Sequence, residues 1–157
     1  MGVKMDIVFW RHAEAGEATD SALDMERPLT GKGEKQAARM AEWLNRQLPE
    51  ATKIWVSPAL RAVQTVIPLE RKYKIRDELA PDAEPDAVLK AIHWLQMKST
   101  AMIVGHQPTL GKTISQLLGL SAQEIAIKKG AVWWLRYRER DGVGQTVVVT
   151  VQTPELL

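Results

Sequence analysis

Three short apolar runs in the chain each end abruptly at polar residues. They are residues 7–10 (IVFW), 53–56 (KIWV) and 100–104 (TAMIV). The runs show little alternation of apolar and polar side chains, which is typical of strands that are covered on both faces. We therefore predict three buried strands, each ending at a point where the chain becomes polar.

Helical patterns follow each predicted strand. Thr30 is a good N-cap for a helix that runs to about Leu48, where Pro49 ends it. Ser57 as N-cap, with Pro58 in the first helical position, predicts a helix that Pro68 kinks or ends. Two further helices are predicted at residues 86–97 and after residue 108, the second running to 118.

The remaining segments complete an α/β pattern. Residues 11–29 show no periodicity and are predicted to form a long loop, and residues 74–79 a short edge strand. Residues 132–137 and 146–151 flank Asp141-Gly142, which favours a hairpin turn. We expect one domain over residues 1–157: a three-layer α/β/α sandwich with a mostly parallel sheet and a C-terminal antiparallel hairpin.

Composition narrows the possible functions. The net charge of +2 over 157 residues gives no reason to expect nucleic acid or an anionic membrane as a partner. The chain has no cysteine, so disulfides, thiolate chemistry and cysteine-ligated metals are excluded, which fits a reducing cytoplasm. No run approaches the roughly 20 apolar residues of a membrane span. We expect a cytoplasmic protein and predict nothing about its oligomeric state.

The polar residues that end the strands are chemically similar. They are Arg11 and His12 after the first strand, Ser57 and Arg61 after the second, and His106 after the third. Parallel strands bring their carboxyl ends to one edge of a sheet, where ligands bind. Two arginines and two histidines there would form an anion site, and guanidinium groups match the paired oxygens of phosphate.

Two histidines indicate chemistry as well as binding. A neutral imidazole can attack phosphorus and form a covalent intermediate. Neighbouring arginines disfavour a charged imidazolium, so His12 is expected to be neutral and nucleophilic near neutral pH. The second imidazole, His106, can donate a hydrogen bond to phosphoryl oxygens. This arrangement requires neither a metal nor another cofactor, and a zinc site between two arginines is disfavoured by charge.

Four motifs resemble those of the histidine phosphatase superfamily. They are RHAEA at 11–15, RPLTGKGEKQA at 27–37, SPALRAVQT at 57–65 and VGHQP at 104–108. The short chain is most similar to the small bacterial phosphohistidine phosphatases of the SixA type. The resemblance implies that His12 is the phosphorylated nucleophile, and that Arg11, Arg61 and His106 form the phosphate pocket. Ala13 departs from the glycine that is commoner after the histidine.

Further contributions to the pocket are expected from three residues. Ser57 lies at a strand end, Gln107 can offer its backbone, and Arg27 can reach the phosphate from the long loop. The general acid is left open among three carboxylates. Glu78 falls roughly where many superfamily members place an acid, and the alternatives, Glu14 beside the nucleophile and Asp24 in the loop, remain.

The resulting hypothesis is a phosphatase that acts through phospho-His12. An imidazole leaving group needs a proton donor less than an alkoxide does, so weak evidence for an acid favours phosphohistidine as substrate. The expected partner is a phosphorylated protein such as a histidine phosphotransfer domain. Two alternatives stay open: a phosphatase of small phosphorylated metabolites, and a regulatory module that binds phosphate without turnover.

Overall fold

A single six-stranded sheet organises the molecule, in the order β3–β2–β4–β1–β5–β6. The computed structural model describes residues 3–17, 21–121 and 123–157. The strands are β1 (Val3–Arg11), β2 (Lys53–Val56), β3 (Lys74–Ile75), β4 (Ala101–Gly105), β5 (Val132–Arg140) and β6 (Val143–Gln152). Strand β1 therefore lies inside the sheet, between β4 and β5.

The sheet is parallel on one side of β1 and antiparallel on the other. Strands β3, β2, β4 and β1 run in the same direction, and Arg11 of β1 lies opposite Gly105 of β4. Strand β5 returns antiparallel to β1 and continues into β6. The turn between them has positive φ angles, 52° at Asp141 and 79° at Gly142, as a tight hairpin requires. This confirms the predicted mostly parallel sheet and its C-terminal hairpin.

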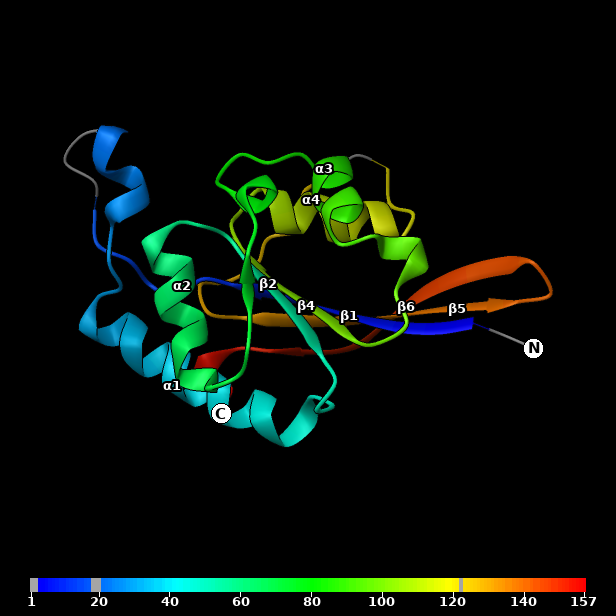
Figure 1. Ribbon diagram of the computed structural model, residues 1–157, viewed down its shortest axis with the longest axis horizontal. Coiled ribbons are helices and arrows are strands. Elements are labelled where there is room, and N and C mark those ends of the chain that lie inside the picture. The colour runs from blue at the N-terminus through cyan, green and yellow to red at the C-terminus, as the bar shows by residue number, and fades with distance from the viewer. Residues whose placement is uncertain (1–2, 18–20, 122) are drawn as a thin grey trace.

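Helices cover both faces of the sheet (Figure 1). Helices α1 (Gly31–Gln47) and α2 (Leu60–Val66) lie on one face, and α3 (Pro85–Ala91) and α4 (Thr109–Leu117) on the other. Two cores result, one on each face. Trp10 of β1 and Leu44 of α1 belong to the first, and Phe9 of β1 and Ile114 of α4 to the second. The expected three-layer α/β/α architecture is confirmed.

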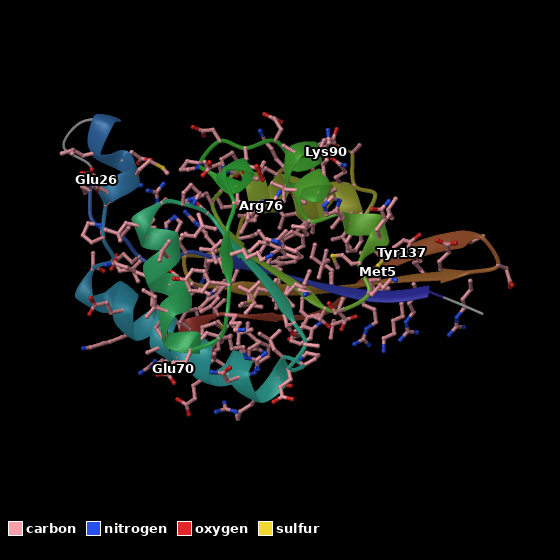
Figure 2. All side chains as sticks on the ribbon, viewed as in Figure 1. Met5, Glu26, Glu70, Arg76, Lys90 and Tyr137 are labelled. Carbon is pink, nitrogen blue, oxygen red and sulfur yellow. The ribbon has the colours of Figure 1, made fainter. Side chains whose placement is uncertain are left out.

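Side chains fill the space between the layers, as Figure 2 shows. Met5 of β1 and Tyr137 of β5, both labelled there, lie opposite one another toward the hairpin end of the sheet. No helix in the described part of the chain is both long and apolar enough to cross a membrane.

Helix α1 follows the sequence pattern closely. The side-chain oxygen of Thr30 accepts a hydrogen bond of 3.0 Å from the backbone N–H of Gly33, so Thr30 is the predicted N-cap. Ala37, Met40 and Leu44 recur at helical spacing and are buried against the sheet. The helix ends at Gln47, because Pro49 follows.

The predicted start of the second helix was wrong. Helix α2 begins at Leu60, and Ala59 rather than Ser57 is its N-cap. The hydroxyl of Ser57 instead accepts a hydrogen bond of 3.1 Å from the backbone N–H of Ala59. Ser57 therefore stabilises a local turn before the helix, an alternative that serine offers as readily as a cap.

Two other elements are shorter than predicted. Only Lys74–Ile75 of the expected edge strand pairs with β2, and Asp77–Leu79 forms a 3₁₀ turn. Helix α3 stops at Ala91, because His93 adopts a left-handed conformation with φ of 52°. A 3₁₀ turn, Trp94–Gln96, replaces the last part of the predicted helix.

The long loop after β1 contains more structure than the sequence indicates. Residues Ser21–Glu26 form a 3₁₀ helix, and Ala15 forms an isolated bridge with Leu29. These contacts fold the loop back over the carboxyl end of β1. The loop thereby becomes one wall of the site described next.

Candidate active site

His12 is held by backbone hydrogen bonds on both sides. Its N–H donates to the carbonyl of Gly105 at 3.0 Å, and its carbonyl accepts from the N–H of Gly130 at 3.0 Å. The imidazole is 7% exposed. Its Nδ1 lies 2.7 Å from the carbonyl oxygen of Ala13. Because a carbonyl only accepts, Nδ1 carries the hydrogen and Nε2 keeps its lone pair.

His106 lies beside His12 at the end of β4. The two ring centroids are 5.2 Å apart and the rings are tilted by 54°. Nε2 of His106 is 2.7 Å from the hydroxyl oxygen of Ser57, which directly follows β2. Three parallel strands therefore contribute side chains to one point, as the strand-end pattern predicts.

Both imidazoles are held in the neutral form. Burial lowers the pKa of His12 to about 4, and the positive charges of Arg61, Arg11 and Arg27 add to this effect, against the hydrogen bond to Ala13. Burial likewise lowers the pKa of His106 to about 2, followed by its interactions with His12 and the same arginines. At neutral pH each ring therefore carries one hydrogen and one lone pair on its two nitrogens.

Two guanidinium groups accompany the histidines. Arg11 donates from Nη1 to the carbonyl of Ile127 at 2.6 Å, and Arg61, only 3% exposed, lies in the first turn of α2. Burial lowers the pKa of both groups. Arginine nevertheless remains charged at neutral pH. Two positive charges are thus fixed next to two neutral rings.

Three buried nitrogens of the described side chains lack a hydrogen-bond partner, and all three belong to this cluster. They are Nε of Arg11, Nε of Arg61 and Nδ1 of His106. Leaving a buried donor unpaired costs roughly 1–3 kcal/mol. Unpaired donors are concentrated at functional sites, where a ligand can satisfy them. Their gathering at one point indicates a site for a ligand rich in acceptor oxygens.

These residues line a pocket of about 370 Å³. Its lining is predominantly polar, and the members are Arg11, His12, Ala15, Asp24, Arg27, Arg61, Pro81, Asp82, His106, Gln107 and Lys129. Four cationic side chains face two carboxylates there. In the part of the chain that the structure describes, no three histidine, aspartate or glutamate side chains cluster closely enough to hold a metal ion.

Asp24 joins Arg27 of the long loop to Arg61 of α2. Its carboxylate accepts from Nε of Arg27 at 3.1 Å and from Nη2 of Arg61 at 3.3 Å. Its backbone carbonyl accepts from Nη1 of Arg61 at 2.7 Å. Arg27 also donates to the carbonyl of Gly16 at 2.9 Å, so it is both a pocket residue and a brace for the loop.

The other two candidate acids lie outside the pocket lining. Glu78 is exposed, and its carboxylate pairs with Arg76 at 2.9 Å. The carboxylate of Glu14 accepts from the hydroxyl of Thr30 at 2.9 Å, at the N-terminus of α1. Of the three acids considered from the sequence, the structure therefore brings only Asp24 to the histidines.

Gln107 lines the pocket, but its side chain is occupied elsewhere. Its amide nitrogen donates to the carbonyl of Ile125 at 2.8 Å, and its amide oxygen accepts from the N–H of Gly111 at 2.7 Å. The side-chain amide of Gln107 is therefore not available to a ligand.

Several contributors could not be recognised from the strand ends. Asp82 and Lys129 line the pocket from segments that show no regular pattern. Asp82 has a positive φ of 69°, which a turn allows. Gln64 and Thr65 of the SPALRAVQT motif act as supports: Gln64 accepts from the N–H of Leu29 at 2.8 Å, and Thr65 from that of Ala13 at 3.0 Å. Gln64 and Thr65 could be found from the sequence, because they belong to the SPALRAVQT motif.

A larger groove of about 860 Å³ lies at the amino ends of the parallel strands, opposite the ends that carry the histidines. It is lined by residues that precede or begin β2 and β4, including Lys53 and Lys98. It contains neither of the strand-end histidines. The smaller pocket, with its buried and unpaired donors, is therefore the candidate active site.

The fold and this site define a class of protein. The chain belongs to the histidine phosphatase superfamily (branch 1), which matches residues 7–86. The match includes His12 and Arg61, and the fold places His106 beside them.

Individual relatives agree with this assignment. The chain is 31% identical over 121 residues to the phosphohistidine phosphatase SixA of Escherichia coli strain K12, covering 72% of this chain and 74% of that protein. It is 32% identical over 143 residues to an uncharacterized protein of a Picosynechococcus species, covering 84% and 85%. A structure of the protein histidine phosphatase SixA complexed with tungstate has a TM-score of 0.78 and 25% identity, covering 97% and 99% of the two chains.

Proposed function

We propose that this protein is a phosphatase that removes the phosphoryl group from phosphohistidine on another protein, through a covalent intermediate at His12. The observation that carries the proposal is the pair of buried neutral imidazoles, 5.2 Å apart, between the guanidinium groups of Arg11 and Arg61. Arg11, Arg61 and His106 are assigned to the phosphoryl group, with Ser57, Arg27 and the backbone of Gln107 as supporting groups.

The nucleophile is Nε2 of His12. The hydrogen bond from Nδ1 to Ala13 fixes the tautomer, so the lone pair of Nε2 is available without removal of a proton. The pKa of about 4 keeps this lone pair free at neutral pH. The backbone contacts of His12 on both sides hold the ring in place during attack.

Charge on the phosphoryl group is met by groups that are already in place. The arginines neutralise its equatorial oxygens, and the partnerless nitrogen of His106 can form a further hydrogen bond there. The hydroxyl of Ser57 bonds the other ring nitrogen of His106 and so fixes the orientation of that ring. These groups require little reorganisation when the phosphoryl group moves.

The transfer step balances without an additional acid. Nε2 of His12 forms a bond to phosphorus while the bond from phosphorus to the substrate imidazole breaks. A substrate ring that carries a proton on its other nitrogen leaves as neutral imidazole, and phospho-His12 retains the proton on Nδ1. The attacking and the leaving imidazole are chemically equivalent. A separate proton donor therefore accelerates this transfer less than it accelerates the departure of an alkoxide.

Hydrolysis then completes the cycle. A water oxygen attacks phosphorus, the bond to Nε2 of His12 breaks, and both water protons remain on the released dihydrogen phosphate. Neutral His12, still protonated on Nδ1, is regenerated. Water can approach because the pocket opens to the surface and is lined mainly by polar groups.

The position of the carboxylates supports this substrate class. Both carboxylate oxygens of Asp24 are already engaged, one by Arg27 and the other by Arg61. Glu78 and Glu14 are engaged outside the pocket. A proposal that needs no strong acid fits a phosphohistidine, and the similarity to relatives named phosphohistidine phosphatase supports the same choice.

A substrate comparison tests the proposal. The purified protein is given a histidine phosphotransfer domain phosphorylated on histidine, a phosphoserine peptide and a set of phosphorylated sugars and nucleotides. We expect the phosphohistidine to be hydrolysed with the highest kcat/KM. A preference for a metabolite, or no release of phosphate from any substrate, would contradict the proposal.

The intermediate can be examined directly. After brief mixing with a labelled substrate, phosphate bound to the protein should be labile in acid and stable in base, as for a phosphoramidate. His12→Ala should lose both the label and turnover. The matched control is His93→Ala, which removes the exposed histidine outside the pocket and should retain both. Label that survives in His12→Ala would exclude His12 as nucleophile.

Asp82 supports a second candidate, the hydrolysis of small phosphomonoesters. It lines the pocket and, within the described residues, makes no ion pair. An alkoxide leaving group requires a proton, and the carboxyl group of Asp82 is in a position in the pocket lining to supply one from its protonated form. Asp82→Asn separates the two functions, since it should reduce ester hydrolysis strongly and phosphohistidine hydrolysis little.

A further inference from the structure

The two edges of the sheet are constructed differently. Strand β3, at one edge, pairs over two residues and carries Lys74, with Lys72 and Arg76 beside it. Short strands and lysines are usual means of preventing an edge from pairing with another chain. Strand β6, at the other edge, is ten residues long and has neither lysine nor proline. Only one edge of the described sheet is therefore protected.

Strand β6 also exposes apolar side chains. Its sequence, VGQTVVVTVQ, has no charged residue at all. Five of its valines are exposed by 39–70%: Val143, Val147, Val148, Val149 and Val151. β-branched side chains in an uncharged strand favour pairing over solvation.

The surroundings leave this edge accessible. Strand β6 pairs with β5 on one side, and in the described sheet no strand adjoins its other side. The hairpin that carries it projects beyond the helices (Figure 1). One register shift interrupts the ladder to β5 opposite Trp134 and Leu135, so residues 143–148 form a regular stretch of six on the hairpin side of it.

We propose that β6 is a dimerisation edge, on which a second copy of this chain pairs antiparallel to form a continuous sheet across both protomers. A two-fold axis brings the same strand from each copy together, so one patch must complement itself. An uncharged strand of valines and threonines does so, because no like charges meet across the axis. None of residues 143–152 lines the pocket, so the two pockets remain open and the assembly does not depend on their chemistry.

A second copy fits this edge better than an unrelated peptide. Peptides that add a strand to a sheet edge are normally selected by pockets for alternate side chains or by charges. Strand β6 offers neither, since its exposed side chains are similar valines on both faces. What it offers is backbone hydrogen bonds and an apolar surface that an identical strand matches.

Sedimentation of the intact protein tests the proposal first. From low to several hundred micromolar protein, the mass should rise from that of a monomer to that of a dimer. Val147→Lys combined with Val149→Lys should remain monomeric, with an unchanged circular dichroism spectrum and unchanged hydrolysis of an aryl phosphate. A wild-type protein that stays monomeric throughout, or a well-folded double variant that still dimerises, would overturn the proposal.

The absence of cysteine permits a second, site-specific test. Val147→Cys introduces the only thiol of the chain, close to a partner's strand if β6 pairs with β6. Under mild oxidation it should form a covalent dimer at least ten times faster than Ile75→Cys, on the opposite edge, although Ile75 is the more exposed of the two positions, at 50% against 41%. Equal rates for the two variants would contradict pairing through β6.

Discussion

Asp24 bonds the guanidinium of Arg61 twice, through its carboxylate at 3.3 Å and its backbone carbonyl at 2.7 Å. A negative charge thus lies beside the arginine that we assign to the phosphoryl group. The carboxylate must share Arg61 with an incoming phosphate or release it. The same carboxylate also holds Arg27, so Asp24 both repels an anion and keeps two cations in position.

Asp24→Asn separates these two effects, because the amide retains a hydrogen-bonding oxygen without the charge. We expect inorganic phosphate to inhibit the variant about three- to ten-fold more tightly, since one like-charge repulsion is lost. The measurement is the inhibition constant for phosphate against an aryl phosphate substrate. Asp77→Asn, outside the pocket, is the control and should behave as wild type. Weaker inhibition in Asp24→Asn would show that positioning of the arginines dominates.

Ser57→Ala should impair turnover more than binding. The hydroxyl orients His106 at 2.7 Å and accepts from Ala59 at 3.1 Å, so its loss frees the ring to rotate. A lost hydrogen bond of this kind corresponds to about a ten-fold decrease in kcat, with a smaller change in KM. Steady-state kinetics decide the matter. Ser99→Ala, which lies just before the amino end of β4 and outside the pocket, serves as the control. An unaltered kcat in Ser57→Ala would refute the positioning role.

Activity should persist in moderately acid solution. The proposed attack by His12 requires a neutral ring, and the pKa of His12 is lowered to about 4, mainly by burial. The value of kcat/KM should therefore be insensitive to His12 titration down to about pH 5 and should fall about ten-fold per unit below pH 4. The pH profile is measured with a substrate that does not itself titrate in that range. A decline centred near pH 6.5 would mean that His12 keeps the pKa of an exposed imidazole.

The same burial should make the fold sensitive to acid. Both pocket imidazoles have folded pKa values, about 4 and about 2, below the unfolded value near 6.5. Below pH 6.5 the unfolded chain therefore binds protons that the folded chain does not. For each ring, the free energy of unfolding decreases by about 1.4 kcal/mol for every unit by which the pH is lowered. This contribution is fully present above pH 6.5 and is lost progressively on acidification.

Urea unfolding at pH 7, 6 and 5 measures that slope. His12→Gln removes one of the two rings, so its free energy of unfolding should depend less steeply on pH. His93→Gln, at an exposed position, should retain the slope of the wild type. Equal slopes in all three proteins would contradict the assignment of buried neutral histidines.

Gly33 and Gly31 provide a matched pair in the first turn of α1. A Cβ at Gly33 would overlap the backbone carbonyl of Glu14, whereas one at Gly31 would meet nothing within 4 Å. Gly33→Ala should thus destabilise the protein by about 1–3 kcal/mol, while Gly31→Ala should be neutral or slightly stabilising. Thermal unfolding of the two variants tests these expectations, and an activity assay of each variant accompanies it. A Gly33→Ala variant as stable as Gly31→Ala would mean that the loop moves away without cost.

The parts of the site that the sequence predicts share a simple origin. His12, Ser57 and His106 are fixed by strands, and the position of a strand end follows from the local pattern of apolar residues. Asp82 and Lys129 lie in segments whose path depends on packing against distant elements, so no local pattern reveals them. The misplaced start of α2 has a local cause, because Ser57 has two competing uses for one hydroxyl.

The sequence also cannot tell which of the three candidate carboxylates lies in the pocket. Glu14, Asp24 and Glu78 look alike in sequence, and only their partners distinguish them. Glu14 reaches Thr30, Glu78 reaches Arg76 and Asp24 reaches Arg61. Which partner a surface carboxylate meets is a property of the folded loop, since a side chain of this length can turn toward several neighbours.

Hydrogen bonds on both sides of His12, to Gly105 and from Gly130, join it to two neighbouring segments of the sheet region at once. The amide of His12 can exchange its hydrogen with solvent only when that central ladder opens, and this opening is tied to loss of the whole sheet. The proposed nucleophile is therefore held in one position relative to the sheet. The chain around Asp24 meets the site through hydrogen bonds to arginine side chains. The half of the pocket around His12 should therefore open only when the sheet opens, whereas the half around Asp24 is held by side-chain contacts that can break locally.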